Sequence, residues 1–231
     1  MQTLISKKRM LNRVLRRTED GSHTFYVEEI DEHFHSIHGS VQESKLVFIQ
    51  NGLMQKHQSM ISVLEIGFGT GLNALLTLEF SIKNQCPIVY HAIELFPLQP
   101  SEYELLNFND HCNIDERFLK DLHQSDWDTE VSITSTFKLR KCNADIASWK
   151  PIRKYDLVYF DAFAPEKQPE LWNESIFETI FDALNDNAIL TTYCAKGVVR
   201  RTMQSVGFTV ERLEGPPGKR EMLRATKPEK R

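Results

Sequence analysis

From residue 61 onward, short hydrophobic runs alternate with amphipathic segments, and this alternation limits the possible folds more than any other feature of the chain. Such runs are typical of strands buried in a parallel sheet, and the segments between them are typical of covering helices. The expected strands are residues 61–67, 88–95, 137–144, 155–163 and 187–194, and the expected helices are residues 72–82, 102–109, 114–123, 171–184 and 198–206. The pattern predicts an α/β fold with a mainly parallel, Rossmann-like sheet.

The end of the chain has a different pattern. Residues 208–214 and 221–226 are both strand-like, and only the short segment GPPGKR separates them. Two strands joined by so short a loop must run antiparallel. We therefore expect the parallel sheet to finish with an antiparallel C-terminal hairpin.

The first part of the chain, residues 1–60, lacks the alternation. It contains strand-like pieces at 23–27 and 46–49, and the pair Asn51-Gly52 near its end favours a turn. We expect residues 1–60 to form an N-terminal cap on a Rossmann-like domain of residues 61–231. A chain of 231 residues is an ordinary length for one compact unit of this kind.

Cysteine spacing and hydropathy exclude several classes of protein. The four cysteines include no CxxC pair, which argues against a zinc knuckle and a disulfide framework. No apolar stretch approaches the roughly 18 residues of a membrane span, and the N-terminus lacks the pattern of a secretory signal. We therefore expect a cytoplasmic protein without a membrane partner.

Charge is distributed unevenly along a chain whose net charge is -4. Basic residues outnumber acidic ones from Lys196 to the end, and a second basic run contains Lys7, Lys8, Arg9, Arg13, Arg16 and Arg17. These runs are compatible with a polyanionic partner and equally with the solvated faces of ordinary helices and tails.

The segment VLEIGFGTGLNAL contains the strongest local motif. A buried strand leads into Glu65, then Gly67, Gly69 and Gly71, and then a helix. Glycines at this corner let the backbone approach a ligand closely, and the helix offers free N–H groups. The spacing is GxGxG and not the GxGxxG of nicotinamide enzymes. It resembles the first motif of class I methyltransferases, in which this loop holds the methionine and ribose parts of S-adenosylmethionine.

Acidic residues follow the next strands at the same edge of the predicted sheet. Glu94 ends the second strand, where a carboxylate can accept hydrogen bonds from ribose hydroxyls. Asp145 follows the third strand, placed to accept from an adenine amino group, and Asp161 ends the fourth. Together with Glu65, these residues predict a cofactor site at the carboxyl ends of the strands.

The stretch YDLVYFDAFAPEKQPELW is the most specific part of the sequence. Together with the glycine motif, IELFPL, LTTYCAKGVVRRTMQSVGF and PPGKREMLRA, it resembles the MnmC-type tRNA methyltransferase domain over roughly residues 20–226. The resemblance implies a class I fold and methylation of 5-aminomethyl-(2-thio)uridine at the tRNA wobble position. The chain is too short for the flavin-dependent oxidase domain of bifunctional members, so we expect the stand-alone form.

Asp161 and Phe163 are the expected catalytic residues. Asp161 would capture the amine, orient it and accept its proton, while Phe163 would help to remove water. Tyr193, at the end of the fifth strand, is expected to contact the substrate. Basic residues near the same edge are expected to hold the tRNA anticodon arm: Lys196, Arg200, Arg201, Lys219 and Arg220.

Other interpretations remain. A methyltransferase or aminopropyltransferase acting on a small amine can share the glycine turn and the acidic strand ends, and an RNA-binding protein with an unused cofactor fold is a further alternative. His33, His35 and His38 lie close in sequence, but the spacing lacks partner ligands of a settled metal motif, so no metal is expected.

Overall fold

The computed structural model describes residues 11–229 and is built around an eight-stranded sheet. The strand order is β10-β11-β9-β8-β4-β5-β7-β6. The parallel strands are β4 (Ile61–Ile66), β5 (Ile88–Ile93), β7 (Phe137–Cys142), β8 (Tyr155–Phe160) and β9 (Leu184–Thr192). Every residue of β4, β5 and β8 is buried, as expected for strands covered on both faces.

Antiparallel strands complete both edges of the sheet. The predicted C-terminal hairpin is confirmed as β10 (Thr209–Glu214) and β11 (Glu221–Thr226), with β11 antiparallel to β9. At the other edge, β6 (Glu130–Thr134) pairs antiparallel with β7 and was not predicted. Its short sequence contains no buried residue and carries only a weak hydrophobic signal.

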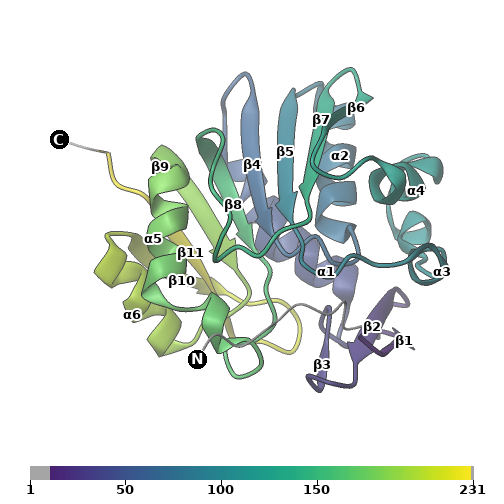
Figure 1. Ribbon diagram of the computed structural model, residues 1–231, viewed down its shortest axis with the longest axis horizontal. Coiled ribbons are helices and arrows are strands. Elements are labelled where there is room, and N and C mark those ends of the chain that lie inside the picture. Colours follow the sequence, from purple (N-terminus) through teal and green to yellow (C-terminus); the bar gives the residue numbers. More distant parts are fainter. Residues whose placement is uncertain (1–10, 230–231) are drawn as a thin grey trace.

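Helices cover the two faces of the sheet and complete the predicted α/β fold (Figure 1). One layer contains α1 (Ser40–Ser44), α2 (Leu72–Asn84) and α4 (Arg117–Gln124), and the other contains α5 (Glu174–Ala183) and α6 (Gly197–Val206). Each layer packs on its own cluster of buried hydrophobic side chains. The shorter helical segments are η1 (Lys45–Gln50), η2 (Leu53–Gln55), α3 (Pro100–Tyr103), η3 (Phe108–His111) and η4 (Pro169–Leu171).

Two expected elements were wrong. Residues 46–49 are helical within η1, where Phe48 packs against Tyr159 at a ring separation of 5.1 Å. A short apolar run of this kind cannot be told from a buried helix by periodicity. The helix expected at 102–109 is replaced by α3 and η3, because Pro100 starts α3 earlier within a capping box formed by Gln99 and Glu102.

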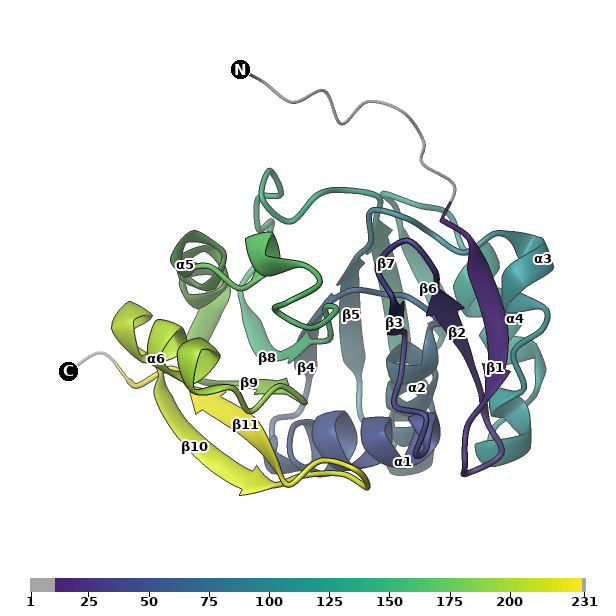
Figure 2. The ribbon, with the colours of Figure 1, turned by 90° about the horizontal axis from the view of Figure 1, so that it is seen from below.

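The N-terminal region forms a separate small sheet. Strands β1 (Arg13–Arg17), β2 (His23–Val27) and β3 (Glu32–His33) are antiparallel and lie near the carboxyl ends of the parallel strands (Figures 1 and 2). Phe25 and Phe48 belong to the same buried cluster as the strands of the large sheet. The division at residue 60 stays a prediction, and the first ten residues lie outside the described part of the chain.

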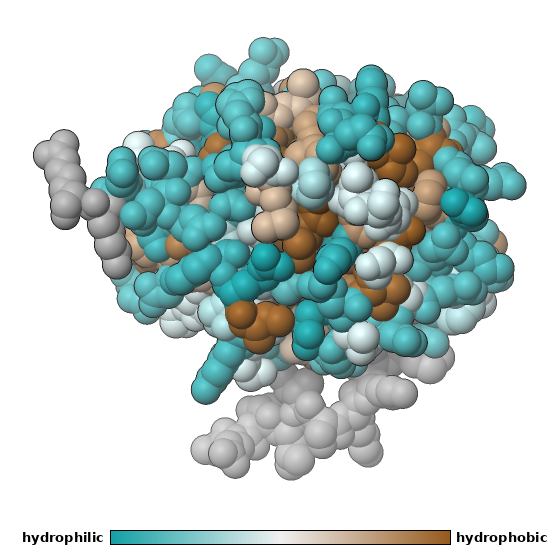
Figure 3. All heavy atoms as spheres, turned by 90° about the horizontal axis from the view of Figure 1, so that it is seen from above, coloured by the Kyte–Doolittle hydropathy of each residue, from teal (hydrophilic) through white to brown (hydrophobic). Residues whose placement is uncertain are grey.

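The end of the molecule opposite the small sheet has a mostly hydrophilic surface with a few hydrophobic residues among polar ones (Figure 3).

Over the whole described part of the chain, the large hydrophobic side chains that are exposed are Ile37, Met54, Met60, Leu95, Leu105, Ile152 and Val198. Between residues 11 and 229, no helix combines the length and the apolar character needed to cross a bilayer.

Candidate active site

A cavity of about 790 Å³ lies at the carboxyl ends of β4, β5 and β8. This is where open α/β sheets bind their ligands, and the volume is that of a small-molecule site. We call its two sides the floor and the roof. The floor is formed by Gly67, Gly69, Glu94 and Asp161, and the roof by Phe34, His35, Glu43 and Lys219.

The glycine loop of the floor is tightly enclosed. Gly67 has a φ of 90°, and a Cβ atom there would lie 2.8 Å from the carbonyl oxygen of Asp161. Gly69 has a φ of 49°, and a Cβ atom would lie 2.9 Å from the Phe34 ring. Both positions therefore need glycine for backbone conformation and for space. Gly71 precedes α2 and does not line the cavity.

Glu94 is fixed by the backbone around it. Its carboxylate accepts hydrogen bonds from the N–H groups of Gly69, at 2.9 Å, and Phe96, at 2.7 Å. Each carboxylate oxygen keeps a further lone pair for a ligand hydroxyl. Asp145 also lines the cavity, is exposed, and accepts from the Ala147 N–H at 2.9 Å.

Glu65 lies beneath the cavity and does not line it. Its Oε1 accepts a hydrogen bond from Asn73 Nδ2 at 2.9 Å, and the same nitrogen donates to Asp161 Oδ2 at 2.8 Å. Burial raises the pKa of Glu65 well above its usual range. Glu65 therefore positions Asn73, which in turn orients the Asp161 carboxylate.

Among the carboxyl groups that line the cavity, Asp161 has the pKa that departs furthest from its ordinary value. Burial raises its pKa to about 7, and the negative charge of Glu43 acts in the same direction. The Asn73 hydrogen bond and the positive charge of Lys219 oppose this change only partly. A carboxylate with such a pKa can exchange a proton near neutral pH.

Two predicted aromatic residues stand beside Asp161. Phe163 lines the cavity, and its carbonyl accepts from the Trp172 indole N–H at 2.8 Å. Tyr193 also lines the cavity, and its hydroxyl donates to the Ala162 carbonyl at 2.8 Å. The Trp172 and Tyr193 side chains thus bond to the backbone of the loop that follows β8.

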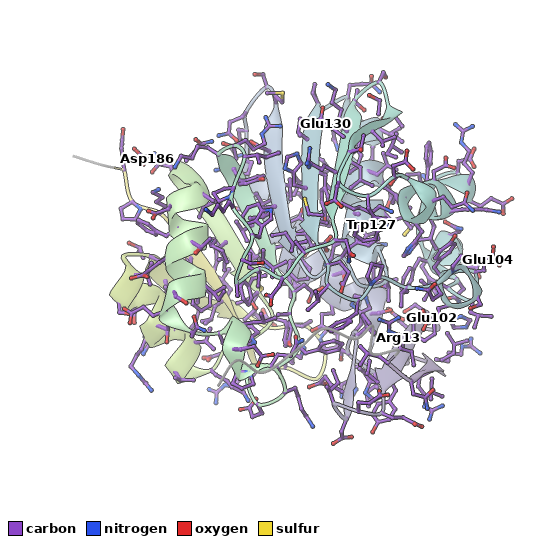
Figure 4. The ribbon with its side chains drawn as sticks, viewed as in Figure 1. Arg13, Glu102, Glu104, Trp127, Glu130 and Asp186 are labelled. Atoms are coloured by element: carbon purple, nitrogen blue, oxygen red, sulfur yellow. The ribbon has the colours of Figure 1, made fainter. Side chains whose placement is uncertain are left out.

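The roof comes mainly from the N-terminal region, whose part in the site was not predicted. Phe34 meets Phe163 edge to face at a ring separation of 5.1 Å. The Arg13 guanidinium lies 5.7 Å from the Phe34 ring centre and donates to Glu102 at 2.9 Å (Figure 4). Arg13 is almost fully buried, so this pair ties the small sheet to the segment after β5.

The three clustered histidines separate in the structure. His35 is buried and bonds through Nε2 to the Thr70 hydroxyl at 2.6 Å, and burial lowers its pKa to about 4. His33 packs on Tyr26, and His38 pairs with Glu19. Within residues 11–229 no group of His, Cys, Asp and Glu side chains has the arrangement of a metal site.

The five predicted basic residues do not form one exposed rim. The Lys219 ammonium turns into the cavity, where it contacts Glu43 and lies 3.9 Å from the Tyr193 ring centre. Lys196 pairs with Glu166 outside the cavity. Arg200 is half-buried, and Arg201 and Arg220 are exposed. Lys7, Lys8 and Arg9 lie outside the described residues.

Comparison with known proteins agrees with this geometry. Residues 114–228 match the family described as S-adenosyl-L-methionine-dependent methyltransferase. The chain belongs to this family. Its cofactor is S-adenosylmethionine, and the fold expected for such methyltransferases is confirmed.

Relatives of this methyltransferase include bifunctional proteins. The tRNA 5-methylaminomethyl-2-thiouridine biosynthesis bifunctional protein MnmC of Idiomarina loihiensis is 30% identical over 215 residues, which are 84% of this chain and 35% of the relative. The protein of the same name from Leptospira interrogans is 30% identical over 210 residues, which are 85% of this chain and 32% of the relative. The chain thus spans about one third of the length of these relatives.

Solved structures share the fold of this methyltransferase. MnmC2 from Aquifex aeolicus superposes with a TM-score of 0.75 and 23% identity, covering 96% of this chain and 74% of the other. Spermidine synthase from Thermotoga maritima superposes with a TM-score of 0.54 and 13% identity, and the match covers 94% of this chain and 74% of the other. At these identities the likeness concerns the fold alone.

The cavity of this methyltransferase fits its cofactor. Gly67 and Gly69 leave backbone without side chains along the floor, and Glu94 offers free lone pairs to ribose hydroxyls. Asp145 lies at the neighbouring strand end as a further acceptor. The cavity also extends past Asp161 to Phe163 and Tyr193, which is where a methyl acceptor would lie.

Proposed function

We propose that the chain methylates the exocyclic primary amine of 5-aminomethyl-(2-thio)uridine at the tRNA wobble position. The observation that carries this proposal is a proton-accepting carboxylate, Asp161, inside a cofactor cavity that also has aromatic walls. The names of the bifunctional relatives supply the substrate class. We place this reaction in the cytoplasm, where tRNA is modified.

The proposed reaction needs a neutral amine. When bound, S-adenosylmethionine supplies an electrophilic methyl group on a sulfonium. Asp161 would accept a proton from the bound ammonium group, and the neutral nitrogen would then form a bond to the methyl carbon as the carbon–sulfur bond breaks. The products would be a secondary ammonium ion and S-adenosylhomocysteine, with one proton on Asp161.

The raised pKa of Asp161 makes this proton transfer much less unfavourable. The pKa of an ordinary aspartate lies about 6 to 7 units below that of a lysine-like ammonium group. Proton transfer from the ammonium group to such an aspartate therefore costs about 9 kcal/mol. With the pKa of Asp161 at about 7, the gap shrinks to about 3 units, or about 4 to 5 kcal/mol. Phe163 supports the same step by excluding water from the amine.

The tRNA partner would meet the outer edge of the cavity. Arg201 and Arg220 are exposed and are candidates for phosphate contacts of the anticodon arm, whereas Lys196 pairs with Glu166 and Arg200 is half-buried. Phosphate contacts release condensed counterions, so tRNA affinity should fall with salt while cofactor affinity hardly changes.

The proposal is tested with the purified chain, radiolabelled S-adenosylmethionine and tRNA that carries free 5-aminomethyl groups. Label should enter the wobble nucleoside, and nucleoside mass spectrometry should find the methylaminomethyl product. An unmodified tRNA transcript is the matched control and should accept no label. Label in another nucleoside, or transfer only to small amines, would refute the proposed substrate.

A further inference from the structure

The Lys219 ammonium occupies a built site inside the cavity. It contacts Glu43, whose side chain is only 6% exposed, and lies 3.9 Å from the centre of the Tyr193 ring. Its positive charge also acts on the carboxyl group of Asp161. A buried carboxylate, an aromatic face and a nearby second carboxyl group are together the surroundings that stabilise an ammonium ion.

This site does not depend on Lys219 for its shape. Glu43 Oε2 accepts from the Ser36 N–H at 2.8 Å, and the Tyr193 hydroxyl is bonded to Ala162. Asp161 is oriented by Asn73. The Asn73 side chain is 2% exposed and lines the cavity, and its Oδ1 has no hydrogen-bond partner among the described residues. A buried acceptor without a partner points to a ligand that brings an N–H donor.

The side chain of Lys219 ends in a primary ammonium group on a methylene carbon. A protonated aminomethyl group has the same two-atom end. We propose that Glu43, Tyr193, Asn73 and Asp161 form a site for a primary alkylammonium group. In the free protein Lys219 occupies the side of this site formed by Glu43 and Tyr193, and in the complex the acceptor amine takes its place and also reaches Asn73 Oδ1. The second half of this inference rests on the proposed function, because that function supplies an aminomethyl acceptor.

Exchange of one ammonium for the other follows from the charges. Two ammonium ions beside each other repel, whereas replacing one by the other keeps the charge of the site constant. Lys219 can leave because its side chain is 32% exposed and belongs to the loop of the β10–β11 hairpin. An outward Lys219 would then be free to meet a phosphate of the acceptor.

The site is tested by chemical complementation. Lys219→Ala removes the natural occupant, and n-propylammonium replaces the lost part of the side chain. At ten times its Kd this ion should raise the melting temperature of the variant by about 3 °C. Wild type and Lys138→Ala, which removes a lysine from an exposed pair with Glu130, should not respond. Uncharged 1-propanol and the double variant Lys219→Ala/Glu43→Gln should also show no shift.

Two results would overturn the site: no response of Lys219→Ala to n-propylammonium, or an equal response of wild type. Should Lys219→Ala fail to fold, its refolding yield with and without the amine gives the same readout. Uptake of the amine requires neither tRNA nor methyl transfer. Its failure is therefore separate from a failure of the proposed function.

The exchange is tested with the free nucleoside 5-aminomethyluridine as acceptor, because a nucleoside lacks the phosphates of tRNA. Removing the competing ammonium should lower the KM for this acceptor several-fold in Lys219→Ala, while Lys138→Ala keeps the wild-type value. A higher KM would mean that Lys219 holds the acceptor and does not yield to it, and the exchange would be wrong.

Discussion

The floor and the roof of the cavity reach the same space from different parts of the chain. The floor is the edge of a parallel sheet, where Gly67, Glu94 and Asp161 directly follow neighbouring strands. The roof joins segments that are distant in sequence, such as Glu43 and Lys219, which lie 176 residues apart. The fold itself thus brings together the floor residues that we propose for cofactor binding and proton transfer, whereas the roof depends on side-chain contacts between distant segments.

The largest effect is expected at the floor, from Asp161→Asn. The amide can still accept the hydrogen bond from Asn73 but cannot take the proton, so turnover should fall by about 100-fold or more. Affinity for S-adenosylhomocysteine, measured by calorimetry, should stay near the wild-type value. Turnover within about threefold of wild type would remove Asp161 from the proton-transfer step.

The second floor carboxylate should affect binding and not chemistry. Glu94→Ala removes an acceptor that holds the N–H groups of Gly69 and Phe96 and faces the cavity. We expect a loss of about 2 kcal/mol, or about 30-fold in the Kd for S-adenosylhomocysteine. Unchanged affinity in a folded variant would contradict the assignment of this strand end to the cofactor.

The pH dependence of kcat/KM distinguishes the titration of Asp161 from that of His35 in the roof. The pKa of Asp161 is raised to about 7, so the proton-accepting form is lost as pH falls through that value. Between pH 8 and pH 6, kcat/KM should fall by about tenfold for a single required deprotonation. His35, with its pKa lowered to about 4, stays neutral over this range. A flat profile over these two units would argue against the raised pKa.

A smaller effect is expected where roof and floor touch. Gly69→Ala places a methyl group against the Phe34 ring. Residue 69 also has a left-handed backbone conformation, which destabilises the alanine variant by about 1 to 2 kcal/mol even without the clash. Adding Phe34→Leu should restore part of the lost cofactor affinity. The matched pair is Gly67→Ala with Phe34→Leu, where the clash is with the Asp161 carbonyl and no rescue is expected. Equal rescue at both glycines would break the distinction between floor and roof.

The floor was predictable because the carboxyl ends of adjacent parallel strands converge whatever the side chains are. The glycine motif, Glu94, Asp145 and Asp161 all line or adjoin the cavity as their positions in the sequence indicated. Asn73 carried a usable signal as well, because it is the second residue of the helix that follows the glycines. Its contact with Asp161 needed the relative placement of β4, α2 and β8.

The roof could not be predicted in this way. No local pattern relates Phe34 or Glu43 to the cavity, and the helical segment η1 resembled a strand in sequence. Lys219 was expected to face phosphate because it sits in a basic loop, yet a buried carboxylate 176 residues away draws it inward. Long-range ion pairs of this kind follow from tertiary packing and leave no periodic trace.

The most direct test of this account is a crystal structure of the chain with S-adenosylhomocysteine. We expect the ribose hydroxyls to bond to Glu94, the homocysteine part to lie along Gly67 and Gly69, and the sulfur to face the side of the cavity that contains Asp161. A nucleoside bound away from Glu94, or a sulfur turned away from Asp161, would contradict the assignment of floor and roof.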